Sequence, residues 1–294
     1  RLDNHEDRSG FAPVREMFHY HAAHEAEYVG NRPVADVLLL NNNRCSDPES
    51  RGWFRALVEH HFLFDTPLLD TALERDWSGY RVVILPDLRY LSDALAAKLD
   101  AYVHGGGTLV SVYQSGFYDE EYEQRDAPAL KSLGIARVEQ VRRDMRSSYL
   151  QVQDKTLFPR LTETDLVFLD GPYLYVRYKA EVEQHLKLVP PHNFGPPERC
   201  YYELVVDRPG FTVARHGQGR AIHVPWLPGS LFHRQGYTNT VWFLVDLLEQ
   251  VAGVTPVGGN LPEQVEVTRM VNEAGFELVH LVNSSGHYLS LIHI

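Results

Sequence analysis

The sequence YRVVILPDLRYLSDALAAKLDAYVHGGGTLVSVY, residues 80–113, has the pattern of a strand, a helix and a second strand. Residues 80–86 are a short and almost wholly apolar run, which is typical of a parallel strand covered on both faces. Ser92 is a favoured helix N-cap, and Gly105 to Gly107 end the helical segment. A β-branched run from Thr108 to Tyr113 follows, and such a connection between parallel strands is right-handed in almost all proteins. The stretch therefore predicts a β-α-β unit.

Segments on both sides of this unit extend the same pattern. Val34 to Leu40 is another buried strand, and Trp53 to His61 places apolar residues at helical spacing. We also expect a short helix from Ala127 to Leu133, a strand from Gly219 to Pro225 and a helix from Thr240 to Val251. We therefore predict an α/β fold with an open, doubly wound, mostly parallel sheet.

Shifts in composition divide the chain into several ranges. We expect a connecting helix in residues 1–33, an α/β domain in 34–257 with a β-rich insertion at 138–213, and the start of a small all-β domain in 258–288. Residues 289–294 match the translation of a common sequencing-adapter end. Since the first residue is Arg1 rather than methionine, we expect this chain to be a fragment.

Charge and composition exclude several classes of protein. The chain has 294 residues, with 28 lysines and arginines against 39 aspartates and glutamates, for a net charge of -11. Such an acidic balance works against binding of nucleic acid or anionic membranes, and no apolar run is long enough to span a membrane. The two cysteines, Cys45 and Cys200, cannot make a disulfide framework. The sequence does not determine the cellular compartment, although we favour the cytoplasm.

Ligands of open α/β sheets bind beyond the carboxyl ends of the strands, so we examined the residues that follow each expected strand. Polar or aromatic residues stand there, and a loop rich in carboxylates and rings follows the strand that ends at Tyr113. The candidate substrate-binding residues are Asn42, Asp87, Gln114, Asp119, Glu120 and Trp226. A solvated loop is the alternative interpretation of Asp119 and Glu120, because catalytic carboxylates usually come from different strand ends.

Neither a metal site nor a cofactor is predicted. His19, His21, His24 and Glu25 cluster in sequence, but no H-E-x-x-H pair accompanies them. The glycine run at 105–107 lies between a helix and a strand, whereas phosphate-binding glycines lie between a strand and a helix. Ser115 lacks the G-x-S-x-G frame of a nucleophile elbow.

The order of these segments resembles a known family. WSGYRVVILP at 77–86, LSD at 91–93 and AYVHGGGTLV at 101–110 are similar to the β-galactosidase trimerisation domain. Pieces at 171–177, 188–191 and 233–236 look like a less characterised branch of these glycoside hydrolases.

The resemblance implies a flavodoxin-like, glutamine-amidotransferase-like fold. It further implies that a catalytic barrel precedes Arg1 and that a small β-sandwich follows Leu261. The catalytic carboxylates of that family belong to the barrel, so no catalytic residue is expected in this chain.

Three functions follow, in order of preference. The first is an accessory and oligomerisation region of a glycoside hydrolase, β-galactosidase-like or fucosidase-like, which associates with copies of itself, as a trimer or another oligomer, and meets carbohydrate through the parent enzyme. The second is a carbohydrate-binding module that uses Tyr118, Tyr122, Trp226 and Tyr237 as a ring face. The third is a free-standing hydrolase that uses Ser115 or the acidic loop.

Overall fold

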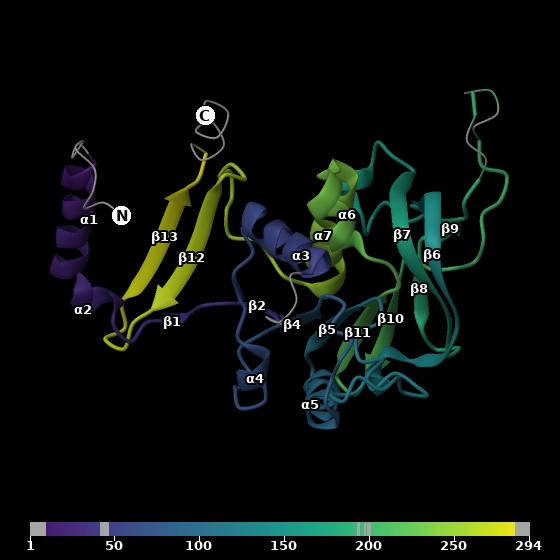
Figure 1. Cartoon of the computed structure of the whole chain (residues 1–294), viewed down its shortest axis with the longest axis horizontal. Coiled ribbons are helices and arrows are strands. Elements are labelled where there is room, and N and C mark those ends of the chain that lie inside the picture. Colours follow the sequence, from purple (N-terminus) through teal and green to yellow (C-terminus); the bar gives the residue numbers. More distant parts are fainter. Residues whose placement is uncertain (1–9, 42–46, 193–194, 197, 199–200, 286–294) are drawn as a thin grey trace.

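A seven-stranded mixed sheet forms the centre of the molecule (Figure 1). The computed structural model describes residues 10–41, 47–192, 195–196, 198 and 201–285. The helices are α1 (Phe11–Ala23), α2 (Glu25–Tyr28), α3 (Pro48–Glu59), α4 (Leu69–Ala72), α5 (Asp93–His104), α6 (Pro228–Gln235) and α7 (Thr238–Asp246). The strands are β1 (Arg32–Pro33), β2 (Val37–Leu39), β3 (Phe64–Asp65), β4 (Val82–Leu85), β5 (Thr108–Val112), β6 (Ile135–Gln151), β7 (Leu166–Tyr178), β8 (Glu183–His185), β9 (Lys187–Val189), β10 (Phe211–His216), β11 (Gly219–Val224), β12 (Val265–Val271) and β13 (Glu277–Asn283).

The central sheet has the strand order β3-β2-β4-β5-β11-β10-β8. The first five strands in that order run parallel, whereas β10 and β8 are antiparallel to their neighbours. Val82 of β4 lies opposite Thr108 of β5, and Leu109 lies opposite Ala221 of β11. The expectation of an α/β fold with a mostly parallel sheet is therefore confirmed at the level of class and sheet.

Alternation along the strands buries one set of side chains on each face of this sheet. Leu38, Val83 and Leu109 pack with α5 on one face. The Ser92 hydroxyl oxygen, as expected, accepts a hydrogen bond from the Leu95 N–H at 3.2 Å and so caps α5. Gly105 follows as its C-cap.

The opposite face carries α3, α6 and α7, which pack on residues such as Leu39, Ile84 and Val110. Helices α3 and α6 touch through glycine, because a Cβ on Gly52 would lie 1.9 Å from the Gly229 carbonyl oxygen. Helix α7 continues into a π-helical segment, Leu247–Ala252. The core thus has two layers of apolar contacts, one on each side of the sheet.

A second, antiparallel sheet, β7-β6-β9, packs beside the carboxyl end of β11. The Leu174 N–H of β7 donates to the Pro225 carbonyl at 2.8 Å, just past β11. The range 138–213 that we expect to be an insertion also contains β8 and the first half of β10, and both strands extend the central sheet. The helix expected from Ala127 to Leu133 is wrong, because only Lys131–Leu133 forms a 3₁₀ turn, which ends at the left-handed Gly134.

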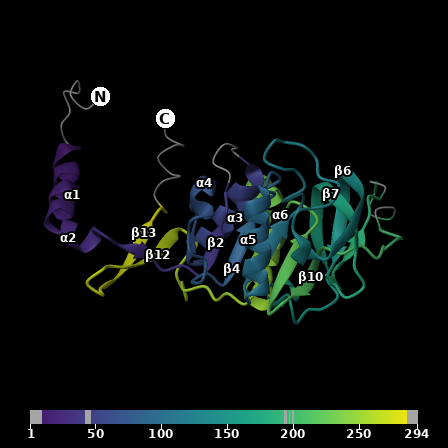
Figure 2. The same cartoon turned by 90° about the horizontal axis from the view of Figure 1, so that it is seen from below.

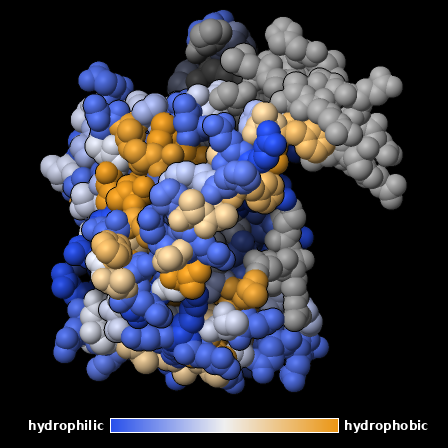
Figure 3. Space-filling view, turned by 90° about the vertical axis from the view of Figure 1, so that its left-hand side faces the viewer, coloured by the Kyte–Doolittle hydropathy of each residue, from blue (hydrophilic) through white to orange (hydrophobic). Residues whose placement is uncertain are grey.

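The two ends of the described chain meet in a third sheet, β1-β12-β13. Helices α1 and α2 lie within the range 1–33, where we expect a connecting helix, and no residue of α1 is buried. Figure 2 shows α1 standing apart from the body of the molecule. At this end of the molecule Phe18, Val279 and Leu281 are more than half exposed. Figure 3 shows the face on this side, with hydrophobic groups among hydrophilic ones. Among the described residues, no helix is long and apolar enough to cross a membrane.

Candidate functional site

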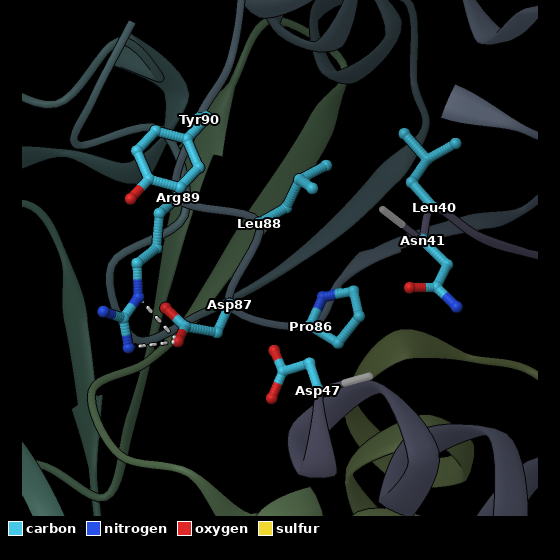
Figure 4. Close-up of a pocket in the computed structure, with 8 residues that line it drawn as sticks. All are labelled: Leu40, Asn41, Asp47, Pro86, Asp87, Leu88, Arg89 and Tyr90. Atoms are coloured by element: carbon cyan, nitrogen blue, oxygen red, sulfur yellow. Dashed lines mark hydrogen bonds and ion pairs between the residues drawn. The ribbon is translucent and has the colours of Figure 1, made fainter. Parts of the chain in front are cut away.

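A cavity of about 340 Å³ opens beyond the carboxyl ends of β2 and β4, where ligands of such sheets bind (Figure 4). Its lining combines apolar, carboxylate, amide and guanidinium groups. The lining residues are Leu40, Asn41, Asp47, Pro86, Asp87, Leu88, Arg89 and Tyr90.

Asp87 is the most constrained of the polar groups in the cavity. Its Oδ2 atom accepts hydrogen bonds from Arg89 Nε at 2.9 Å and Nη2 at 2.7 Å, and its Oδ1 atom accepts one from the Gln114 N–H at 3.2 Å. Its backbone is left-handed, with φ at 55°, a conformation that aspartate tolerates better than most residues. Burial raises the pKa of Asp87 to about 6, although the Arg89 guanidinium acts in the opposite direction.

Asp47 adds a second carboxylate to the cavity, at the start of α3 (Figure 4). Its Oδ1 atom accepts a hydrogen bond from the Glu49 N–H at 2.9 Å, so the side chain is also the N-cap of α3. Burial raises the pKa of Asp47. The signal that could have revealed this residue was the sequence Asp47-Pro48-Glu49, an acidic cap followed by proline at the first helical position.

Three tyrosine rings lie together beside the cavity. The Tyr90 ring centroid is 5.4 Å from that of Tyr118 and 4.7 Å from that of Tyr122. Tyr122 is 63% exposed, so its ring presents a face to solvent. Tyr118 and Tyr122 are in the ring face proposed from the sequence, whereas Tyr90 was missed because it belongs to another loop. This group, Tyr90, Tyr118 and Tyr122, is called the tyrosine cluster below.

The structure separates the other sequence candidates. Gln114 is buried next to Asp87, so these two do come together. Asp119 holds its own loop, because its Oδ1 atom accepts hydrogen bonds from the N–H groups of Glu121 at 3.0 Å and Glu123 at 2.9 Å. Glu120 is exposed on that loop.

Two further substrate-binding candidates from the sequence, Trp226 and Asn42, are not among the described residues that line the cavity. Trp226 is only 1% exposed and its Nε1–H donates to the Gly210 carbonyl at 3.0 Å, so the ring belongs to the core and offers no face to a sugar. The tertiary packing of β7 over the end of β11 covers it, which local sequence does not reveal. Asn42 lies outside the described residues, next to Asn41 of the cavity.

The turn that follows β5 is fixed by hydrogen bonds within the chain. Tyr113 is left-handed, with φ at 49°. Ser115 is fully buried, and its hydroxyl lies 2.8 Å from the Val112 carbonyl and 3.1 Å from the Leu85 carbonyl while accepting from the Leu88 N–H at 3.0 Å. A serine enclosed in this way stabilises the turn and has no access to a substrate.

His223 supports the same turn from β11. Its Nε2 atom lies 2.9 Å from the Tyr113 carbonyl oxygen and its Nδ1 atom 2.7 Å from the Tyr178 hydroxyl. Since a carbonyl only accepts, Nε2 carries the proton and Nδ1 accepts from Tyr178. Burial lowers the pKa of His223 to about 4, so the ring is neutral near pH 7. This histidine is a structural support of the turn.

Among the residues that the structure describes, which include neither cysteine, no group of three or more histidines and carboxylates could hold a metal ion. Of the sequence cluster on α1 and α2, His24 is paired with Glu27 at 3.1 Å. The cavity lining itself supplies amide, carboxylate, guanidinium and aromatic groups.

Comparison with known proteins gives this geometry a context. Residues 41–153 match the family model of the β-galactosidase trimerisation domain. The match confirms the resemblance seen in the sequence. All lining residues of the cavity except Leu40, together with the tyrosine cluster, lie inside this trimerisation-domain match.

Individual relatives agree with the family match. Over 107 residues the chain is 34% identical to the β-galactosidase GalA of Bacillus licheniformis. The aligned region covers 32% of this chain and 16% of that protein. The fold is similar to a catalytic mutant of a GH42 β-galactosidase from G. stearothermophilus, with a TM-score of 0.69 at 20% identity, over 96% of this chain and 39% of that one. It is also similar to α-L-fucosidase isoenzyme 2 from Paenibacillus thiaminolyticus, with a TM-score of 0.67 at 21% identity, over 95% of this chain and 42% of that one. The chain thus spans less than half the length of each of these relatives.

Proposed function

We propose that this chain is the non-catalytic accessory and self-association region of a glycoside hydrolase. The observation that carries the proposal is the trimerisation-domain match at 41–153 in a chain that covers only 16% of its β-galactosidase relative. The parent enzyme would hydrolyse a glycosidic bond with two carboxylates of its own barrel and without a cofactor. Its partners would be copies of itself, in a trimer or another oligomer, and its carbohydrate substrate would be β-galactoside-like or fucoside-like.

The strand order supports the finer fold assignment that belongs to this proposal. Numbered along the chain, the parallel strands β3-β2-β4-β5-β11 have the order 2-1-3-4-5, which is that of flavodoxin-like sheets. We assign this module to residues 34–257, with a connecting segment before it at 1–33 and the start of a β domain after it at 258–288. The hydrogen bonds of Ser115 and His223 favour a scaffold at the turn where related folds place a nucleophile.

Two measurements on the 294-residue chain test the accessory role. Sedimentation equilibrium at tens of micromolar should give a mass above the 33.6 kDa of one chain. Assays with chromogenic galactosides and fucosides should show no turnover. A strictly monomeric chain would contradict the self-association role, and turnover that survives purification to homogeneity would contradict the non-catalytic one.

A second candidate function, carbohydrate binding, is favoured by the tyrosine cluster beside the cavity. Sugar sites combine an aromatic face with a few placed polar groups, and here Asn41, Asp47 and Asp87 supply the polar groups. Gln114 helps to hold Asp87, and Asp119 and Glu120 lie on the loop that carries Tyr122.

Calorimetric titration with galactose and fucose tests this second function. We expect Tyr122→Ala to abolish any heat of binding, while Tyr237→Ala, which removes another exposed ring, should leave it unchanged. Equal loss in both variants, or no heat in the wild-type chain, would argue against a sugar site here.

A further inference from the structure

A cluster of three arginines lines a hollow of about 420 Å³ on the surface. Arg143 and Arg146 come from β6, and Arg234 comes from the last turn of α6. The pairing of β6 with β7 is irregular on both sides of Met145, and such bulges turn side chains out of the regular alternation. Arg143, Arg146 and Arg234, all exposed, are called the arginine cluster below.

The arginine cluster has unused hydrogen-bonding capacity. Within the described part of the chain, the side chains of Arg143 and Arg146 form no hydrogen bond or ion pair, and Arg234 donates only from Nε, to the Ser230 carbonyl at 3.3 Å. By contrast, the neighbouring Arg142 is paired with Asp144 at 2.9 Å. Asp170 lines the same hollow, and none of the described basic residues pairs with it. Guanidinium groups bind carboxylates in a bidentate manner, so this hollow fits carboxylates supplied from outside the chain.

The loop 119–123 carries carboxylates that lack a basic partner within the part of the chain that the structure describes. Glu120, Glu121 and Glu123 are exposed, and their carboxylates have no partner among the described residues. The loop is nevertheless shaped, since Asp119 accepts the N–H groups of two of these glutamates. Residues 119–123, called the acidic loop below, therefore present three carboxylates from a turn that is already formed.

The two charged surfaces belong to the same edge of the molecule. The Tyr113 N–H, at the carboxyl end of β5, donates to the Val224 carbonyl at 2.8 Å. The next carbonyl, that of Pro225, accepts from Leu174 of β7, which lies opposite Val141 of β6, two residues before Arg143. Tyr118 directly precedes the acidic loop. The two surfaces nevertheless do not pair with one another within one chain. Two different patches that complement each other in charge form a heterologous interface, which joins successive copies into a closed ring when the rotation between copies closes.

Aromatic side chains flank both surfaces. Phe168 lines the arginine hollow and lies 5.6 Å, centroid to centroid, from the exposed ring of Tyr237. Tyr122 projects from the acidic loop. Arginine and aromatic residues are enriched in the central parts of protein interfaces, whereas lysine, glutamate and aspartate are depleted there, so the arginines and rings would form the centre of the contact. This composition favours a protein partner over a small anion.

We propose that the arginine cluster of one copy of this chain binds the acidic loop of a second copy. The inference rests on the proposed self-association and names the surface that performs it. Arg143 and Arg146 would receive carboxylates of Glu120, Glu121 or Glu123, with the aromatic rings packed around the ion pairs.

Reciprocal charge reversal, followed by sedimentation velocity, tests the inference on the full 294-residue chain. The variants are Arg143→Glu with Arg146→Glu, Glu120→Arg with Glu121→Arg, and all four changes together. We expect each double variant to weaken self-association by about tenfold or more, because like charges would then face one another. The fourfold variant should regain association, because the ion pairs re-form with reversed polarity. Arg51→Glu with Arg215→Glu, a matched change at exposed arginines elsewhere, should leave association unchanged.

Each other outcome has a definite meaning. If the wild-type chain associates but the double variants associate equally well, the interface lies elsewhere and this inference fails while the proposed function stands. If the fourfold variant does not recover, the acidic loop is not the partner. If inorganic phosphate binds the wild-type chain and not the arginine variant, with assembly unaffected, the hollow is a small-anion site. A wild-type chain that is monomeric at every concentration overturns both proposals.

Discussion

Glu49 Oε2 accepts a hydrogen bond from the backbone N–H of Ser230 at 2.6 Å, across 181 positions of sequence. Its Oε1 atom accepts from the Gly229 N–H at 3.0 Å and from Trp53 Nε1 at 2.8 Å. The carboxyl oxygens thus accept from N–H groups at the start of α6, which have no partner within the helix. Because Asp47 caps the same end of α3, this contact also fixes one wall of the cavity.

The buried carboxyl of Glu49 should make stability depend on pH. Burial raises the pKa of Glu49 from its ordinary value of 4.5 to about 8, so between these pH values the folded state holds a proton that the unfolded state releases. The contribution of the protonated Glu49 carboxyl to the free energy of unfolding is therefore fully present below about pH 4.5 and is lost as pH rises through about 8. We expect urea unfolding to show that Glu49→Gln, which does not titrate, loses less stability than the wild type between pH 5 and pH 8. Parallel pH profiles for the two proteins would contradict this assignment.

The glycine contact between α3 and α6 should tolerate no side chain. A Cβ on Gly52 would lie 1.9 Å from the Gly229 carbonyl oxygen, so Gly52→Ala must push the helices apart. We expect a loss of about 1–3 kcal/mol or more in the free energy of unfolding, measured by urea denaturation. Gly79→Ala is the control, since a Cβ there has no neighbour within 4 Å. Equal midpoints for the two variants would show that the helices are not held in this contact.

The sequence predicted the central strands and missed the contact between the helices, for a physical reason. Val82–Leu85 and Thr108–Val112 are short apolar runs whose pattern already requires cover on both faces. The cap at Ser92 is likewise a local signal. By contrast, the partner of Glu49 lies 181 residues away, and nothing local to either residue identifies the other.

His223 should make the fold sensitive to acid. Burial lowers the pKa of His223 from its ordinary value of 6.5 to about 4, so between these pH values the unfolded state binds a proton that the folded state does not. Stability is therefore lost as pH falls from about 6.5 towards 4. His223→Gln can donate to the Tyr113 carbonyl and accept from the Tyr178 hydroxyl without titrating, so we expect a flatter profile between pH 7 and pH 4.5. Tyr178→Phe, which keeps the histidine, should retain the slope; the same flattening in both variants would refute the role of the ring.

The left-handed backbone at Asp87 should give two substitutions at this position different stabilities. Asp87→Asn keeps a residue type that accepts this conformation, whereas Asp87→Ala adds a backbone penalty of about 1–2 kcal/mol to the loss of the Arg89 contact. We expect thermal unfolding to rank the stabilities as wild type, then Asp87→Asn, then Asp87→Ala. If Asp87→Ala were as stable as Asp87→Asn, the backbone at this position would have relaxed.

Sequence reasoning found only part of the candidate site. Asp87 and Gln114 follow strands whose carboxyl ends meet at one edge, so the topology brings them together. Trp226 follows a strand by the same rule, yet β7 covers it. Burial of that ring depends on a pairing with Tyr173, which no periodicity in either segment reveals.

The pairing of β5 with β11 has a consequence for the chain as it leaves the ribosome. Val112 of β5 lies opposite Val224 of β11. One edge of the nascent sheet therefore has no partner until a strand roughly a hundred residues later has been synthesised. At typical rates of bacterial or eukaryotic translation this wait lasts about 5–20 s. During that interval the edge of β5 is open to the wrong strand, and synthesis of β6 to β10 must finish before the correct one can close it.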